Sequence, residues 1–563
     1  MMRKLLALPL FVSFAVAFAA ALAAVAQEAP RAGETVEVSI VNVDVVVTDR
    51  AGNRVRGLKQ EDFELRENGK VKPISNFAEY TSEAERGTVG VELAERAAAA
   101  PAAAPVRERR TLLVFFEEMQ LPGSAADDFT KSLGETLRSL LAPGDQVSVV
   151  IWSGNRIHHV ELTNEPAKIA DATRLVNDAA KRARVDVGAV QRQESIARQE
   201  YQMDSGITGY MSMAYDEMIV RVAAINSAIN SLAGIGGKKI MLLATRRLGE
   251  VAGAEFAFNE GAARVSSNLR SRFNTDALRQ SIIDNANASG VTIYPLYPPG
   301  GAGGLPDGDY AGIEGGGGVA MRAAIEERVL ANETASLQQI AEETGGLMAA
   351  GPKNVIDLLS HVLSDAGDYY SLAYRVTNTD TDQSRKIVVT TRNPEYKVRA
   401  RTAFVEKSDD TLMRDRLRGT LFRAEQPGAT IGIRAAARPS KKTSRKKPMM
   451  EVRVRIPIGN LTMLPQANGK HGGKFSIYVA AASDLHELSD VTQKTQPFEV
   501  APSEVEQARG SHFTYDLDVE VDDRSKYLAV GVFDEVGKTY GLMRIDLKND
   551  VKPAASPAAK PGR

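Results

Sequence analysis

Between residues 111 and 366, short runs of continuously apolar residues alternate with segments of helical length. These runs are TLLVFF at 111–116, VSVVIW at 147–152, KIMLLA at 239–244 and VTIYPL at 291–296. A strand that is apolar at nearly every position is typical of a sheet whose two faces are both covered by helices. We therefore predict a multidomain α/β plus β protein whose centre, 111–366, is a doubly wound, mostly parallel sheet.

The segments between these runs complete the predicted α/β domain. Residues 158–162 are expected to form an edge hairpin strand, and 347–349 a short further strand. A Gly-rich stretch at 300–318 predicts a loop. Helices are predicted over 127–141, 165–184, 215–232, 278–288 and 323–343.

Outside this region apolar and polar residues alternate with a period of two, which predicts half-buried strands. Residues 35–80 are predicted to form a small N-terminal β module, with Asn68-Gly69 as a hairpin turn. A change of phase at Ile40-Val41 predicts a β-bulge. Strands over 367–406 are expected to complete a β module, and 451–548 a C-terminal β-sandwich-like domain.

Three further segments lack a pattern that could bury a core. They are an Ala/Pro linker at 81–110, a basic linker at 407–450 and a Pro/Ala tail at 549–563. The basic linker contains RPSKKTSRKK at 438–447, which has six basic residues in ten. Such a run is either a solvated linker or a contact for lipid headgroups, nucleic acid or an anionic glycan.

The first 26 residues have the three parts of a secretory signal peptide. Arg3 and Lys4 precede an apolar stretch, and Ala24-Val25-Ala26 is the small-x-small pattern of a cleavage site. The alternative is an uncleaved membrane anchor, because the apolar stretch is long enough to span a bilayer. Either interpretation predicts an extracytoplasmic protein, periplasmic or secreted, and secretion argues against a nucleic-acid partner.

Composition limits the chemistry that the chain can perform. It has no cysteine, so thiol catalysis, disulfides and Cys-ligated metals are excluded. The formal charge of −1 gives no excess that would attract nucleic acid or an anionic membrane to the whole chain. The six histidines form no ligand or catalytic pattern, and we predict no catalytic residues and no enzyme. They are His158, His159, His361, His471, His486 and His512.

Several motifs together resemble one known family. They are VDVVVTD at 43–49, Gly57-Leu58 followed by Asp62-Phe63, YYSLAY at 369–374 and VRAR at 398–401. With the apolar strand at 111–116 between them, the chain resembles bacterial, acidobacterial-type secreted proteins that contain a von Willebrand factor A-related domain. The resemblance implies a von Willebrand A-like sheet in the centre, flanked by β-sandwich-like modules.

Domains of that type commonly bind Mg²⁺ at the carboxyl ends of their strands, through Asp-x-Ser-x-Ser, a distant Thr and a later Asp. Here the first motif falls on residues 117–121, Glu-Glu-Met-Gln-Leu, and the later Asp is replaced by Thr245-Arg246-Arg247. Thr208 could supply the distant Thr. Because two arginines would oppose a cation, we predict a degenerate site with no metal and no cofactor.

The residues of that degenerate site are expected to face one another at the top of the sheet. Glu117 and Glu118 would repel each other in a desolvated crevice. We therefore predict that Arg246 or Arg247 pairs with one of these carboxylates in place of the metal. The candidate ligand face consists of Glu117, Glu118, Thr208, Thr245, Arg246 and Arg247.

Together these features predict a non-enzymatic, extracytoplasmic protein-binding or scaffolding protein. Its expected partner is another envelope or extracellular protein rather than nucleic acid. Membrane contact is expected only through an uncleaved N-terminus or the basic linker. Two alternatives remain open at this point: a Mg²⁺-dependent adhesin of the same fold, and an envelope hydrolase that uses carboxylates.

Overall fold

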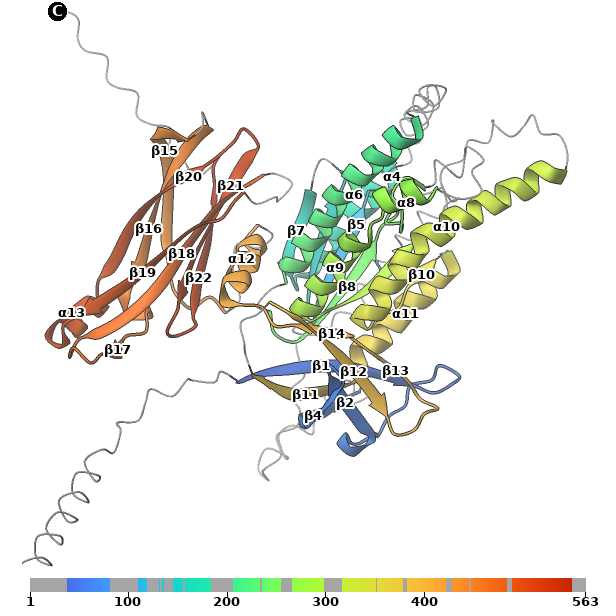
Figure 1. The fold of residues 1–563 in the computed structure, drawn as a ribbon, viewed down its shortest axis with the longest axis horizontal. Coiled ribbons are helices and arrows are strands. Elements are labelled where there is room, and N and C mark those ends of the chain that lie inside the picture. The colour runs from blue at the N-terminus through green and yellow to red at the C-terminus, as the bar shows by residue number, and fades with distance from the viewer. Residues whose placement is uncertain are drawn as a thin grey trace, which may run out of the picture.

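A computed structural model describes residues 38–81, 110–118, 131, 134–135, 145–154, 157–183, 206–232, 235–254, 266–297, 316–350, 352–377, 382–421, 428–444, 447–483 and 489–548. This part of the chain is mixed α/β, with one mostly parallel six-stranded sheet and several antiparallel sheets. We call β5–β10 with α4–α11 the α/β unit, β1–β4 with β11–β14 the first β unit, and β15–β22 the second β unit (Figure 1). The predicted signal peptide lies outside the described residues.

The six-stranded sheet confirms the prediction of a central, mostly parallel sheet. Its order is β10-β9-β8-β5-β6-β7, and only the edge strand β7 runs antiparallel to its neighbour. The strands are β5 (Arg110–Glu117), β6 (Gln146–Trp152), β7 (Ile157–Thr163), β8 (Lys238–Ala244), β9 (Val291–Tyr297) and β10 (Ala349–Ala350).

Helices cover both faces of this sheet, as the apolar runs require. Alternate residues of β5 point to opposite faces: Phe115 packs with α6, α9 and α10, and Val114 packs with α4 and α11. The helices are α4 (Pro166–Ala183), α6 (Gly206–Asn230), α8 (Ser267–Arg272), α9 (Asp276–Ser289), α10 (Gly316–Thr344) and α11 (Pro352–Gly367). The helix predicted over 127–141 and the loop predicted over 300–318 fall mostly outside the described residues.

The first β unit is assembled from strands that precede and follow the α/β unit. One sheet has the order β13-β1-β11-β4 and the other β14-β12-β2-β3, and both contribute to a single core. The strands are β1 (Val38–Thr48), β2 (Phe63–Glu67), β3 (Lys70–Lys72), β4 (Ile74–Tyr80), β11 (Tyr369–Thr377), β12 (Ser384–Thr391), β13 (Lys397–Ala400) and β14 (Ala403–Val405). A short 3-10 helix, η1 (Gln60–Asp62), precedes β2.

Two local predictions for this unit have different outcomes. Asn68 and Gly69, at φ 47° and 80°, form the expected tight turn between β2 and β3. The predicted bulge at Ile40-Val41 is wrong, because β1 pairs with β11 in unbroken register from Val38 to Val45. Ile40 instead points outward and is 59% exposed.

Buried charges join the α/β unit to the first β unit. Asp365 of α11 is fully buried, pairs with Arg54 and Arg399, and accepts a hydrogen bond from the Tyr294 hydroxyl at 2.7 Å. Burial raises the pKa of Tyr294 to about 12. Because every partner of Asp365 comes from a different strand or loop, these bonds fix the two units against each other.

The second β unit has two sheets, β15-β16-β20 and β17-β18-β21-β22, with β19 added to β18. Both sheets contribute to one core, so they pack face to face. The strands are β15 (Arg434–Ser444), β16 (Lys447–Pro457), β17 (Leu464–Pro465), β18 (His471–Ser483), β19 (Thr492–Val500), β20 (His512–Glu520), β21 (Ser525–Asp534) and β22 (Tyr540–Asp546). Short helices η4 (Ile458–Asn460), η5 (Pro502–Glu504) and α13 (Val505–Arg509) connect them.

The prediction of a basic linker over 407–450 is wrong for the part that the structure describes. Residues Asp409–Gly419 form helix α12, whose Met413 and Leu417 are fully buried between α6 and the second β unit (Figure 1). These two apolar residues are spaced i, i+4 on one face, but charged neighbours mask them in the sequence. Of the basic run, residues 438–444 lie in β15, and Lys447 is the first residue of β16.

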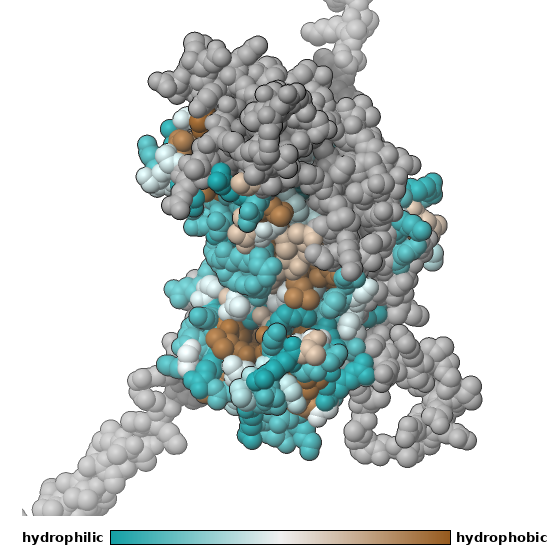
Figure 2. All heavy atoms as spheres, turned by 90° about the vertical axis from the view of Figure 1, so that its right-hand side faces the viewer, coloured by the Kyte–Doolittle hydropathy of each residue, from teal (hydrophilic) through white to brown (hydrophobic). Residues whose placement is uncertain are grey.

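None of the helices in the described residues combines the length and apolar character needed to cross a membrane. On the face shown in Figure 2, apolar side chains of the described residues occur in small groups separated by hydrophilic ones. Scattered groups of this kind are normal for a protein surface and mark no interface by themselves.

Candidate functional site

The carboxyl ends of β5, β6 and β8 bring the main candidate site together. β5 lies between β6 and β8, and its last residue, Glu117, is in register with Trp152 of β6. On its other side Phe116 is in register with Ala244, so Thr245 leaves β8 beside Glu117. From β5 the strand order proceeds to β6 and β7 on one side and to β8, β9 and β10 on the other. The carboxyl end of β5 is therefore the topological switch point, where open α/β sheets bind ligands.

Three donors hold the buried carboxylate of Glu117. Oε1 accepts a hydrogen bond from Nε of Arg221 at 2.9 Å. Oε2 accepts from the hydroxyl of Thr245 and from the backbone N–H of Arg246, the latter at 3.1 Å. Both carboxylate oxygens are therefore committed to groups of the protein itself.

Arg221 reaches this carboxylate from helix α6, and its side chain is only 2% exposed. Its Nη2 donates to Glu217 at 2.8 Å, and its Nη1 donates to the carbonyl of Arg247 at 3.4 Å. The guanidinium also lies 5.2 Å from the ring centre of Trp152, a cation–π arrangement. A buried guanidinium with this many partners acts as a fixed positive charge at the end of β5.

A second polar cluster continues along the same edge toward β9. The side chain of Arg246 turns away from Glu117 and approaches Glu333 of α10, with Nε 4.0 Å from Oε2. Its Nη2 donates to the Tyr297 hydroxyl at 3.2 Å, and that hydroxyl donates to Glu333. Burial, and then the charge of Glu333, raise the pKa of Tyr297. Tyr297 is therefore a neutral donor at physiological pH.

The structure brings some of the predicted residues together and separates others. Glu117, Thr245 and the backbone of Arg246 meet as expected. At Glu117 the predicted pairing with Arg246 or Arg247 does not form, because Arg221 from α6 provides the guanidinium. Arg247 contributes its carbonyl oxygen and adopts a left-handed φ of 56°.

The two remaining predicted residues do not reach the Glu117 carboxylate. The backbone N–H of Glu118 donates to the carbonyl of Trp152 at 2.8 Å, which continues the ladder between the strands. Thr208 lies in the first turn of α6, roughly 20 Å along the helix axis from Arg221. This distance is too great for a hydroxyl on the first turn to share a site with Glu117.

Sequence reasoning missed Arg221, although one signal was present. Residues 218–232 read MIVRVAAINSAINSL, so Arg221 is the one charged residue in an otherwise apolar and small-residue stretch of helix. A charge in the buried face of a helix requires a partner. Glu117, the acid at the end of the first apolar strand, was the natural candidate for the partner of Arg221.

The donor set does not fit a divalent cation. Mg²⁺ prefers carboxylate and water oxygens, but the Glu117 carboxylate already accepts from Arg221, Thr245 and the Arg246 amide, and the Arg221 guanidinium would repel a cation. Within the described residues there is no group of three or more His, Asp or Glu that could hold a metal.

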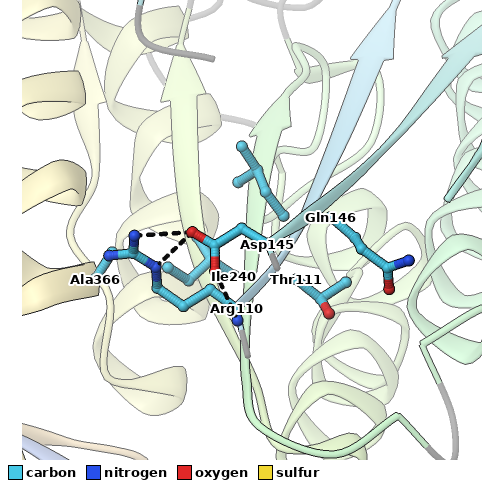
Figure 3. A pocket seen from close by; sticks show the side chains of 7 residues that line it. Arg110, Thr111, Asp145, Gln146, Ile240 and Ala366 are labelled. Atoms are coloured by element: carbon cyan, nitrogen blue, oxygen red, sulfur yellow. Dashed lines mark hydrogen bonds and ion pairs between the residues drawn. The ribbon is translucent and has the colours of Figure 1, made fainter. Parts of the chain in front are cut away.

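A small cavity lies at the opposite, amino-terminal edge of the sheet (Figure 3). Its volume of about 10 Å³ is at the lower limit for a single water molecule. Arg110 lines it and donates to Asp145 through Nε at 2.9 Å, through Nη2 at 2.8 Å and through its backbone N–H at 3.1 Å. This cavity has a structural role, since it is too small for an organic ligand.

Comparison with known proteins adds little to this geometry. Neither a protein-family model nor a curated protein matches the sequence. Among solved structures, the chain is similar to the X-ray structure of Northeast Structural Genomics Consortium target SoR45, with 10% identity and a TM-score of 0.15. The match covers 25% of this chain and 98% of that one.

Proposed function

We propose that this chain is a non-enzymatic, extracytoplasmic protein-binding or scaffolding protein. In this proposal the α/β unit is a von Willebrand A-like domain in which a guanidinium stands where such domains hold a metal ion. The observation that carries the proposal is the bond between Arg221 and Glu117 at the carboxyl edge of the sheet. In this proposal the Arg221 guanidinium balances the negative charge of Glu117, as a bound metal ion would.

The order of the strands supports this assignment. Numbered along the chain from β5, the six strands have the order 3-2-1-4-5-6, which is the order of an open doubly wound sheet. Ligands of such sheets bind outside the carboxyl ends, where the order reverses. Glu117 lies at that position.

The chemistry of the edge favours a protein partner bound without a metal bridge. The carboxylates of Glu117 and Glu333 are buried beside the guanidinium groups of Arg221 and Arg246, which would repel a bridging cation. Glu217 extends the cluster outward, and its side chain is 50% exposed. A partner would meet a rigid surface whose polar groups are already oriented. The N-terminal 26 residues support an envelope or extracellular location for this contact.

Site-specific photo-crosslinking in envelope extract tests the proposal. A benzoylphenylalanine at Glu217 should give a discrete protein adduct whose yield is the same in Mg²⁺ and in EDTA. The matched control places the probe at Glu165, whose side chain is 59% exposed. Glu165 follows β7 at the opposite edge of the sheet and should give no adduct of that size.

Each other outcome of this experiment contradicts a defined part of the proposal. An adduct that EDTA abolishes would favour the Mg²⁺-dependent adhesin. Equal adducts from Glu217 and Glu165 would show that the carboxyl edge is not the binding face. No adduct from Glu217 in extracts where the chain co-purifies with a partner would place the contact on another unit.

A further inference from the structure

The outer face of the sheet β15-β16-β20 carries an unusual grouping of arginines. Ala436 of β15 lies directly opposite Arg453 of β16, between Arg434 and Arg438 on its own strand. Arg455 lies diagonally opposite, because it pairs with Arg434. All five residues belong to the exposed alternate positions of their strands. We call Arg434, Arg438, Arg453 and Arg455, with Ala436 as the floor, the arginine cradle.

Two of the four guanidiniums are neutralised within the sheet. Arg453 binds Asp516 of β20 through two parallel hydrogen bonds of 2.7 and 2.8 Å. Arg438 donates to Glu451 through Nε at 3.0 Å. Asp518, one strand beyond Glu451, accepts from the hydroxyl of Ser440. None of these acidic residues is directly opposite Arg434 or Arg455, although Asp516 is diagonal to Arg455 across β16 and β20.

The other two guanidiniums, of Arg434 and Arg455, have no ion pair or hydrogen bond within the described part of the chain. These residues are direct cross-strand neighbours, so their Cβ atoms are about 4.5–5.5 Å apart. Like charges in that position destabilise a sheet. A local arrangement that opposes stability, on a rigid and exposed face, is typical of a functional site.

We propose that the arginine cradle binds a phosphate monoester group. The two unneutralised guanidiniums supply a charge of +2, which matches the dianion that a monoester forms at neutral pH. The planar fork of each arginine suits two oxygens of a tetrahedral phosphate. The small side chain of Ala436 leaves room for the group between the four arginines. This surface belongs to the second β unit, so the proposal is independent of the function proposed for the α/β unit.

Charge selectivity separates this ligand from other anions. A carboxylate or a phosphodiester has a single negative charge and would leave one guanidinium of the Arg434–Arg455 pair uncompensated. Phenyl phosphate is a suitable monoester probe, and diphenyl phosphate is the matching diester. Inorganic phosphate distinguishes a free ion from a phosphorylated ligand, because only the monoester has an organic group to contact the sheet.

Titration calorimetry of the full chain at constant ionic strength tests the proposal. Phenyl phosphate should bind saturably, and about tenfold more tightly than diphenyl phosphate. The double substitution Arg434→Gln/Arg455→Gln should weaken phenyl phosphate binding by at least about tenfold. The control Arg524→Gln/Lys526→Gln removes two charges from the same unit, beyond the far end of β20, and should leave binding within about twofold of the wild type.

Thermal unfolding provides a second readout that does not depend on the ligand. Without phosphate, Arg434→Gln should raise the melting temperature of the full chain, because it removes the like-charge contact with Arg455. Equal binding by the wild type and Arg434→Gln/Arg455→Gln, equal binding of monoester and diester, or no binding of phenyl phosphate would each overturn the proposal. Tighter binding of inorganic phosphate than of phenyl phosphate would overturn the claim that the ligand is a phosphorylated molecule, because the site would then prefer the free ion.

Discussion

The ammonium group of Lys238 lies 3.6 Å from Oδ2 of Asp44 and 3.5 Å from the centre of the Tyr369 ring. Lys238 is the first residue of β8, whereas Asp44 and Tyr369 belong to β1 and β11 of the first β unit. The lysine side chain is 3% exposed. One buried cation therefore joins the amino-terminal edge of the parallel sheet to a unit formed mostly from distant parts of the chain.

The free energy of unfolding should depend on the ionisation of Lys238. Burial lowers the pKa of Lys238 to about 8, against the attraction of Asp44, while the unfolded chain keeps the ordinary value of 10.5. Between these two values the unfolded chain binds more protons than the folded chain, so stability should rise with pH. Relative to Lys238→Met, the wild type should gain up to about 3 kcal/mol from pH 8 to pH 10.5. Urea unfolding of both proteins across this window measures the difference, and a difference independent of pH would contradict the argument.

Loss of the guanidinium at the carboxyl edge should strongly destabilise the protein. Arg221→Met leaves the buried carboxylate of Glu117 without its cation, and we expect a loss of about 3–5 kcal/mol in urea unfolding. Arg174→Met is the control, because Arg174 forms an exposed pair with Asp171 on α4 and should change stability by less than about 1 kcal/mol. The double change Glu117→Gln/Arg221→Met should recover part of the loss, since it removes the stranded charge. Equal losses for Arg221→Met and Arg174→Met would contradict a buried, paired Arg221.

Magnesium should have no specific effect on this protein. Arg221 occupies the position from which a cation would balance Glu117, so millimolar Mg²⁺ should not raise the melting temperature above that in matched NaCl. Differential scanning calorimetry with Mg²⁺ and with EDTA measures this directly. A saturable rise that Glu117→Ala abolishes would restore the adhesin alternative.

Two glycines should respond in opposite ways to the same substitution. A Cβ on Gly346 would lie 1.9 Å from the carbonyl oxygen of Ile293 in β9, so Gly346→Ala should displace the strand and cost about 1–3 kcal/mol. A Cβ on Gly209, within helix α6, would have no neighbouring atom within 4 Å among the described residues, and Gly209→Ala should stabilise by about 0.5–1 kcal/mol. Thermal unfolding of the two variants should therefore show melting temperatures on either side of the wild type. A loss of stability in Gly209→Ala would show that this position is not a relaxed helical one.

Much of the α/β unit follows from local sequence pattern. The apolar run at 239–244 predicted β8 to within one residue, because a short, nearly continuous apolar run between helical segments is typical of a strand buried on both faces. Helix α6 begins at Gly206, nine residues before the predicted start at 215. The prediction started too late because Gly206 and Gly209 are residues that usually interrupt helices. Packing of Met211 against Phe273 and Val329 compensates for their poor helix propensity.

The candidate site was only half predictable. Glu117 and Thr245 come directly after buried strands, and the order of a doubly wound sheet then brings them together. The identity of the arginine depends on how α6 lies across the sheet, and no local pattern encodes the rotation of a helix about its axis. The pairing of Arg453 with Asp516 likewise depends on strand register, which is fixed by the core side of the sheet rather than by the charged side.

The split construction of the first β unit imposes an order on its biosynthesis. β1 pairs with β11, and the N–H of Leu58 donates to the hydroxyl of Tyr370, 312 residues later in the chain. At about 5–20 residues per second of synthesis, the early strands wait many seconds for their partners. During that time they present open edges and exposed valines to other chains. We therefore expect a nascent chain of this design to be prone to aggregation until Tyr369–Thr377 has emerged.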